Sequence, residues 1–237
     1  MNIKDVLDQH ENVLFLFSGG KDSVAAFYHL QEYWDSLIVG WINTGDLCPE
    51  IESFVRATAK KASRFFTVYS DSRKWQEENG WPYPVVPVDY TTVGQQVSGK
   101  TDITISPYLS CCKANIWDQI PVLIEITRST AVLTGQRKQD DSKDPRPSGT
   151  WIKGAQYFYP IEDWTDQEVR DYLRNKVGLT DPRFYTDDSS IDCRHCTGYP
   201  KYKSRTEYLK KHHPQAQQEV DRRWGLIRQA VEDSYEI

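Results

Sequence analysis

The sequence predicts an α/β fold, a doubly wound and mostly parallel sheet with a C-terminal helical extension. Short apolar runs that are typical of strands buried on both faces alternate with segments whose apolar residues recur at helical spacing. This alternation favours parallel strands joined by right-handed crossovers. Small polar clusters follow three of the strands, at the edge of the sheet where such folds bind ligands.

The same patterns place the individual elements along the chain. Strands are expected at residues 13–17, 37–42, 65–69, 131–133 and 157–159. Helices are expected at about 24–34, 49–64, 111–125, 165–173 and 204–234, with a break at Pro214 in the last. Thr165 and Glu168 have the spacing of a capping box. Residues 70–110, rich in proline and glycine, form a long excursion, and residues 136–151 a polar loop.

The composition excludes several classes of protein. Of the 237 residues, 38% are hydrophobic and 27% are charged, which is typical of a globular protein and not of a disordered one. The net charge of −5 argues against a general nucleic-acid binder. No apolar run approaches the ~20 residues that span a bilayer, and residues 1–13 lack the apolar core of a signal peptide. We therefore expect a cytoplasmic protein with no membrane partner.

Residues 18–23, Ser-Gly-Gly-Lys-Asp-Ser, form the polar cluster between the first strand and the first helix. Its two glycines permit a tight turn and let an anion approach backbone N–H groups, where the helix dipole favours negative charge. Lys21 adds a positive charge, and the hydroxyls of Ser18 and Ser23 can donate to phosphate oxygens. The spacing differs from that of the G-x-x-x-x-G-K-[ST] loop. The alternative to a phosphate site is an ordinary polar connection.

The other two clusters are residues 43–46 and 134–138, after the second and fourth strands. Because the carboxyl ends of parallel strands share one edge of a sheet, we expect all three clusters to form one site. Arg137 and Lys138 suit an anion there. The alternative for Arg137 is a solvated cation of the loop.

Four of the five cysteines occur in two pairs, Cys111-Cys112 and Cys193-x-x-Cys196, separated by 80 residues. Without an export signal a disulfide framework is not expected, so the pairs point to metal ligation. Four thiolates suit zinc or an iron–sulfur cluster, and adjacent cysteines fit a larger cluster better than one small ion. The third alternative is two buried pairs without metal. Cys48 stands alone and is interpreted as an ordinary buried thiol.

Residues 18–23 resemble the PP-loop of the ATP-pyrophosphatase (adenine nucleotide alpha-hydrolase) superfamily. Four further segments resemble those of the PAPS reductase family within it, in the same order, so that the resemblance spans residues 13–197. These segments are Asn43-Thr44-Gly45 with Pro49-Glu50, Thr134-Gly135-Gln136-Arg137, Pro160-Ile161-Glu162-Asp163-Trp164-Thr165, and Ser190-Ile191-Asp192-Cys193-Arg194-His195-Cys196-Thr197. Asn43 stands where the family pattern has aspartate.

The resemblance implies a nucleotide site and a metal site. ATP, or APS or PAPS, with Mg²⁺ would bind at Ser18, Gly19, Gly20, Lys21, Asp22, Ser23, Thr44, Gly45, Gly135 and Arg137. The catalytic residues among these would be Lys21, Asp22 and Arg137. A [4Fe–4S] cluster like that of bacterial APS reductases would bind at Cys111, Cys112, Cys193 and Cys196. Residues 1–200 would form the nucleotide-binding domain that carries these cysteines, with residues 201–237 packed on it as a helical extension.

Reductases of this family attack sulfur with a thiolate in a C-terminal E-C-G-x-H segment, and no cysteine follows Cys196 in this sequence. We therefore expect a different reaction, in which ATP is cleaved between its α and β phosphates and an acceptor is adenylated for sulfur transfer. One alternative is an APS or PAPS reductase with a non-standard thiol, for which Cys48 remains. Another is a non-catalytic, nucleotide-sensing subunit that acts through a partner.

Residues 199–213 interleave basic and aromatic side chains, a pattern that can grip a nucleic-acid strand. The acceptor can accordingly be a nucleic acid, and a protein or a small molecule is the alternative. A solvated helix face also accounts for the pattern. His195, between two of the paired cysteines, is expected near the metal or at the surface rather than as a ligand. We also expect the chain to form a homo-oligomer.

Overall fold

The structure, a computed structural model, describes residues 2–140, 146–185, 193–200 and 202–235. It forms two compact units that interleave along the sequence. Unit 1 comprises Met1–Ile42, Pro49–Val68 and Gln119–Thr186, and unit 2 comprises Asn43–Cys48, Tyr69–Asp118 and Asp187–Ile237. The C-terminal residues join the central excursion in unit 2, and the expected domain boundary at residue 200 stays a prediction.

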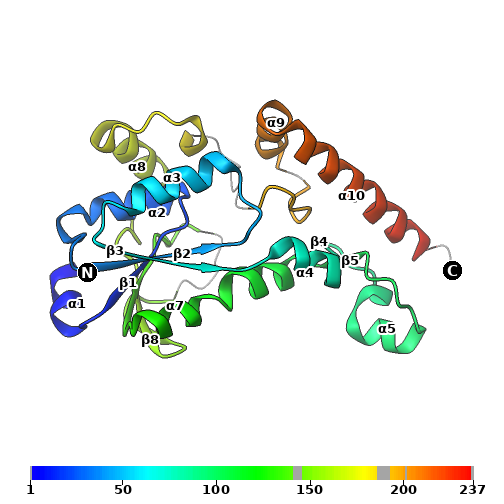
Figure 1. The fold of residues 1–237 in the computed structure, drawn as a ribbon, viewed down its shortest axis with the longest axis horizontal. Coiled ribbons are helices and arrows are strands. Elements are labelled where there is room, and N and C mark those ends of the chain that lie inside the picture. Colours follow the sequence, from blue (N-terminus) through cyan, green and yellow to red (C-terminus); the bar gives the residue numbers. More distant parts are fainter. Residues whose placement is uncertain (1, 141–145, 186–192, 201, 236–237) are drawn as a thin grey trace. The chain divides into compact units, whose positions relative to one another are not determined.

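Unit 1 is built on a six-stranded sheet in the order β3-β2-β1-β6-β8-β7 (Figure 1). The strands are β1 (Val13–Leu16), β2 (Leu37–Asn43), β3 (Arg64–Tyr69), β6 (Ala131–Leu133), β7 (Thr150–Ile152) and β8 (Ala155–Phe158). β1 pairs in parallel with β2 and β6, β6 pairs in parallel with β8, and β7 is antiparallel to β8. The order extends outward from β1 in both directions, which places the topological switch point between β1 and β6. The predicted fold class is confirmed.

The side chains of strand β1 alternate between the two faces of the sheet, and both faces are buried. Phe15 packs against Phe27 of α2 (Lys21–His29), with ring centroids 5.7 Å apart. Leu14 points the other way, into a cluster with Leu123 of α7 (Ile120–Thr127). Figure 1 shows α2 and α3 (Pro49–Ala59) on one side of the strands and α7 on the other. This core holds the end of β1, where residues 18–23 begin.

Two further helices, α1 (Ile3–Gln9) and α8 (Asp166–Tyr172), complete the main helices of unit 1. The predicted capping box opens α8: Glu168 N donates to Thr165 Oγ1 over 3.2 Å, and Thr165 N donates to Glu168 Oε2 over 2.7 Å. Helix α2 ends at His29, five residues before the predicted end, and a 3₁₀ turn over Gln31–Tyr33 follows.

The helix predicted over residues 111–125 is wrong in its bounds. The chain instead forms α6 (Tyr108–Cys112), a π-helical turn over Lys113–Trp117, and then α7. Pro121 explains the interruption, because proline lacks the N–H of a continuous helix and its ring collides with the preceding turn. The first turn of a helix tolerates proline, so a new helix begins there.

Strand β7 was predicted as part of a polar loop. It forms a hairpin with β8 in which Ile152 lies opposite Ala155, so only Lys153 and Gly154 connect the strands. Both connecting residues have positive φ, 47° and 92°, as a type I′ turn requires. A lysine at the first of these positions gives a weaker sequence signal than asparagine or aspartate, which is why the hairpin was missed.

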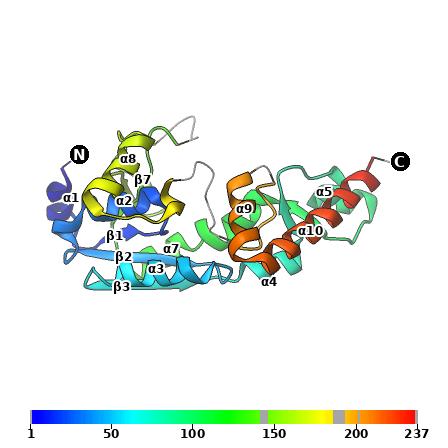
Figure 2. The same ribbon diagram turned by 90° about the horizontal axis from the view of Figure 1, so that it is seen from above.

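Unit 2 contains the central excursion and the C-terminal helices (Figure 2). Its elements are α4 (Ser72–Asn79), β4 (Trp81–Tyr83), α5 (Thr92–Ser98), β5 (Ile105–Pro107), α6, α9 (Lys203–His212) and α10 (Pro214–Asp233). β4 and β5 pair in parallel. Ile227 and Ala230 of α10 form a core with Tyr90 and Ile105. The predicted break at Pro214 is confirmed. Among the described residues, no helix is both long enough and apolar enough to cross a bilayer.

Candidate functional site

The loop between β1 and α2 has the geometry of an anion cradle. Gly19 has φ +81°, and a Cβ there would lie 2.5 Å from the Cγ2 atom of Val55. Gly20 is the N-cap of α2 and provides no side chain to cap it. The first N–H groups of α2 therefore have no capping side chain among the described residues, and the helix dipole adds partial positive charge there.

The two loop hydroxyls brace the turn. Ser23 Oγ accepts from Gly19 N over 3.1 Å and donates to the Gly20 carbonyl over 2.9 Å. Ser18 Oγ donates to Ser23 Oγ over 3.0 Å and accepts from Gly20 N over 3.3 Å. The hydroxyls thus keep the loop in shape, and their expected role as phosphate donors stays a prediction.

Gly135, just after β6, brings a second predicted cluster to the same place. A Cβ on Gly135 would lie 2.6 Å from the carbonyl carbon of Asp22 and 2.7 Å from Ser23 N. Only glycine allows the strand end to approach the first turn of α2 this closely. Residues 18–23 and 134–138 therefore meet at the switch point of unit 1, as the sequence predicts.

Charged side chains alternate in sign above this turn. Lys21 Nζ lies 2.9 Å from Asp22 and 2.8 Å from Asp166. Arg137, which is 6% exposed, contacts Asp22 over 2.9 Å and Asp140 over 3.0 Å. Both cations that were predicted to hold phosphate are thus engaged by carboxylates.

Asp166 has a strongly perturbed pKa. Partial burial works against its ionisation, yet hydrogen bonds from Lys21 and Arg170 outweigh that effect and lower the pKa of its carboxyl to about 2. Sequence reasoning missed Asp140 and Asp166 as members of the site. Asp166 directly follows the predicted cap Thr165, where an acidic residue is common at a helix start, and no motif marks Asp140.

A pocket of about 340 Å³ adjoins this cluster in unit 1. It is positively charged on balance and is lined by Gln136, Arg137, Lys138, Arg146, Pro147, Ser148, Tyr159 and Glu162. Lys138 pairs with Asp163 over 2.5 Å, which together with Glu162 raises the pKa of the ammonium group. Arg146 was not among the predicted site residues, and the pocket adds it to the cations that an anionic ligand could meet.

The third predicted cluster, residues 43–46, belongs to unit 2 and contacts the C-x-x-C segment there. Thr44 Oγ1 lies 3.4 Å from Cys193 Sγ. Asp46, fully buried, accepts from the backbone N of His195 over 2.9 Å and lies 2.6 Å from its Nδ1 atom. The expected contact of Thr44 and Gly45 with a nucleotide stays a prediction. His195 lies near the paired cysteines and is buried, not at the surface.

The four paired cysteines all belong to unit 2. Burial, together with the neighbouring Cys196 and Cys112 thiols, raises the pKa of the Cys111 thiol to about 12. Cys111 Sγ also receives weak hydrogen bonds from the amides of Asn115 (3.7 Å) and Gln76 (3.9 Å). Cys111 and Cys196, which are 85 positions apart in the sequence, therefore lie close to each other.

Comparisons with known proteins decide the family. The family model described as phosphoadenosine phosphosulfate reductase domain matches residues 12–199, most of the chain. The chain belongs to the PAPS reductase family. A crystal structure of phosphoadenylyl-sulfate (PAPS) reductase from Candida auris, in a phosphate complex, is similar with a TM-score of 0.55. At 12% identity over 80% of this chain and 84% of that one, it supports the fold alone. No match was found among curated proteins.

The surroundings of the cysteines in this PAPS reductase family chain fit a negatively charged thiolate centre. Gly198 N donates to Cys196 Sγ over 3.3 Å. Arg205, 1% exposed, donates to the carbonyl oxygens of Cys193 (2.9 Å) and Arg194 (3.1 Å), and its buried Nη1 atom has no hydrogen-bond partner among the described residues. Buried cations and N–H donors of this kind stabilise thiolates around a metal.

A second buried arginine links the two cysteine pairs. Arg223, 5% exposed, donates through Nη1 to Gln76 Oε1 over 2.8 Å and to the His195 carbonyl over 3.3 Å. Gln76 in turn donates to Cys111. The guanidinium of Arg223 thus reaches one cysteine pair through Gln76 and the other through the His195 backbone.

The basic and aromatic segment of the PAPS reductase chain differs in part from its interpretation as a surface. Arg205 lies inside, against the C-x-x-C backbone, and is not available to a nucleic acid. Lys203, Lys210 and Lys211 on α9 are exposed. Lys201 lies outside the described residues. A nucleic-acid or protein acceptor and a homo-oligomer stay predictions.

Proposed function

We propose that this PAPS reductase-family chain binds an adenine nucleotide through residues 18–23 and cleaves ATP between its α and β phosphates, adenylating an acceptor in sulfur transfer. The observation that carries the proposal is the uncapped N-terminus of α2, closed from one side by Gly135 and flanked by Lys21. Backbone N–H groups, a helix dipole and a lysine at one point favour a polyphosphate over other ligands.

The carboxylates at the same point support ATP with Mg²⁺. Asp22, Asp140 and Asp166 surround Lys21 and Arg137. A phosphate chain placed beside three carboxylates is repelled unless a divalent cation bridges them, and Mg²⁺ prefers carboxylate and phosphate oxygens. Bound Mg²⁺ would offset the phosphate charge, and the carboxylates named here would hold it.

The reaction assigns a role to each cation. A nucleophile of the acceptor attacks the α phosphorus, the bond from that phosphorus to the bridging oxygen breaks, and pyrophosphate leaves. Lys21 and Arg137 exchange their carboxylate partners for phosphate oxygens when the nucleotide binds. As the bond breaks, they stabilise the charge that develops on the leaving group. The N–H groups of α2 hold the phosphates in line for the attack.

A [4Fe–4S] cluster on Cys111, Cys112, Cys193 and Cys196 completes the proposal. Such a cluster supplies electron transfer or a Lewis-acidic iron when bound. The Cys196 and Cys112 thiols lie close enough to Cys111 to raise its pKa, and the ligands of one metal centre must come together in this way. Arg205 and Arg223 would balance the charge of the four thiolates.

Reduction of a sulfonucleotide is the second candidate function. The match of residues 12–199 to the phosphoadenosine phosphosulfate reductase domain favours it. In that reaction residues 18–23 and Arg137 hold the phosphate of APS or PAPS, and a thiol attacks the sulfur. The two candidates share the nucleotide site and differ in the atom attacked, phosphorus or sulfur.

Product analysis on the anaerobically purified protein separates the candidates. The protein is incubated with Mg²⁺ and ATP labelled at the α phosphate, in the presence of transfer RNA, DNA or thiol acceptors. We expect pyrophosphate and labelled AMP or adenylated acceptor. Parallel incubations with APS or PAPS and thioredoxin test for sulfite. Sulfite without pyrophosphate supports the reductase, and tight binding without turnover of any nucleotide contradicts both enzymatic functions.

A further inference from the structure

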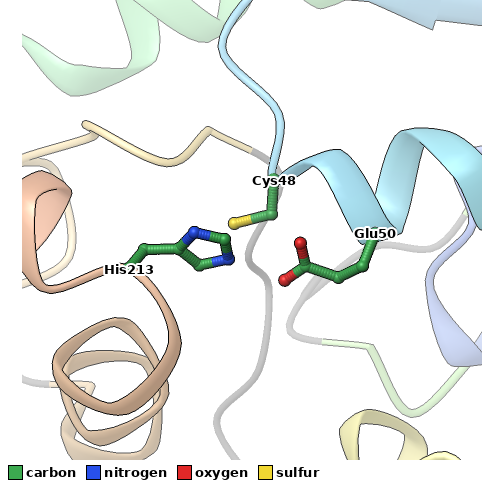
Figure 3. Close-up of side chains that lie close together, drawn as sticks. All are labelled: Cys48, Glu50 and His213. Carbon is green, nitrogen blue, oxygen red and sulfur yellow. The ribbon is translucent and has the colours of Figure 1, made fainter.

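Cys48 and His213, both in unit 2, lie side by side (Figure 3). The Cys48 thiol and a ring nitrogen of His213 are within 4.8 Å of each other, and Cys48 is fully buried. An imidazole beside a thiol promotes its deprotonation, because the thiolate and the imidazolium stabilise each other. We propose that Cys48 is a nucleophilic thiol, with His213 as its base, that accepts electrophilic sulfur.

The backbone around Cys48 is held in place by unit 2. Ser70 N donates to the Asn43 carbonyl over 2.9 Å, and Ser72 N donates to the Thr44 carbonyl over 3.0 Å. Two residues before the cysteine, the buried carboxylate of Asp46 contacts His195. A thiol on a segment fixed at several points is pre-positioned, as a nucleophile requires.

His213 is fixed independently, at the junction of α9 and α10. Pro214 disfavours a helical conformation for the residue before it, and His213 accordingly has φ −137° and ψ 59°. Its N–H donates to the Leu209 carbonyl over 2.7 Å, and its carbonyl accepts from Gln217 N over 3.1 Å. The Tyr208 ring lies 6.1 Å from the imidazole, centroid to centroid.

The inference rests on the proposed role in sulfur transfer and names the group that would receive the sulfur. The Cys48 thiolate attacks the outer sulfur of a persulfide donor, a new S–S bond forms on Cys48, and the S–S bond of the donor breaks. The donor leaves as a thiolate and takes the proton that His213 removed from Cys48. No oxidant or reductant beyond the persulfide is required.

Ionisable residues of unit 2 flank the pair along the chain. They are Asp46, two residues before Cys48, and Lys210, Lys211 and His212, which precede His213 at the end of α9.

Reaction with 2,2′-dipyridyl disulfide tests the inference without any nucleotide. The thiolate attacks one sulfur of the probe and releases pyridine-2-thione, which is followed by absorbance, and mass spectrometry of the peptide that carries residue 48 assigns the site. An ordinary thiol of pKa ~8.5 reacts slowly at about pH 6. We expect Cys48 to be modified at that pH in the anaerobically purified protein, at a rate that falls ~10-fold or more in His213→Gln.

His212→Gln is the matched control, because this neighbouring histidine is exposed and should leave the rate unchanged. Thermal unfolding of both variants reports whether they are folded. The pH profile of the unaltered protein tests the inference even if a variant fails to fold. The inference is overturned if Cys48 stays unmodified, if it reacts only at alkaline pH, or if it reacts only after a chelator is added. Failure of ATP cleavage does not affect this readout, so the two proposals can fail separately.

Discussion

Gly135 and Lys21 show how single residues shape the nucleotide site. Gly135 contributes by having no side chain, since its backbone touches the first turn of α2. Lys21 contributes a charge that carboxylates hold in place. Both residues could be predicted, because a glycine and a lysine stood in recognisable patterns at strand ends. Asp140 and Asp166 could not, since their role depends on distances that no motif encodes.

Replacing Gly135 by alanine should damage the site and destabilise the protein. The new Cβ would lie 2.6 Å from the Asp22 backbone, so the turn must shift at a cost of about 1–3 kcal/mol. Gly225→Ala is the matched control, because nothing lies within 4 Å of a Cβ there, and alanine should stabilise the interior of α10 by about 0.5–1 kcal/mol. Urea unfolding midpoints measure both, and equal shifts in the same direction would contradict the close approach.

Among the elements, α8 has a feature that the sequence predicts correctly, and α9 has one that it does not. The capping box of α8 was predicted residue by residue, because its signal is local. The division of residues 108–127 into α6, a π-helical turn and α7 was not predicted. The helical periodicity continues across Pro121 and masks the interruption. Arg205 of α9 was taken for a surface cation, yet it is buried because the C-x-x-C backbone offers carbonyl acceptors that only folding brings near.

Arg205→Met should loosen the C-x-x-C segment and lower the amount of bound iron. The substitution removes charge-assisted hydrogen bonds to two carbonyl groups, each worth about 1.5–3 kcal/mol. Arg222→Met on α10 is the control, because that guanidinium is 56% exposed and pairs with Glu219 at the surface. Iron and sulfide per chain, measured anaerobically with thermal unfolding, decide the point. Unchanged iron in Arg205→Met would mean that this arginine does not support a metal centre.

At the level of the whole chain, the α/β class could be predicted from the alternation of strands and helices. This alternation can be read along the sequence without knowing which segments are in contact. The interleaving of the two units did not follow, because it depends on which distant segments share a core. Ile227 and Ala230 pack with Tyr90 and Ile105, and the paired cysteines join the same unit. No local pattern specifies which distant segments pack together in this way.

Titration calorimetry of Mg²⁺–ATP into the protein tests most directly whether residues 18–23 hold a nucleotide's phosphates. We expect saturable binding that weakens ~10–100-fold in Lys21→Met, the loss of one charge-assisted contact worth about 1.5–3 kcal/mol. Lys74→Met, at a lysine whose side chain is 69% exposed on α4, should bind like the unaltered protein. Equal affinity in Lys21→Met and Lys74→Met, or no binding by the unaltered protein, would contradict the proposed site.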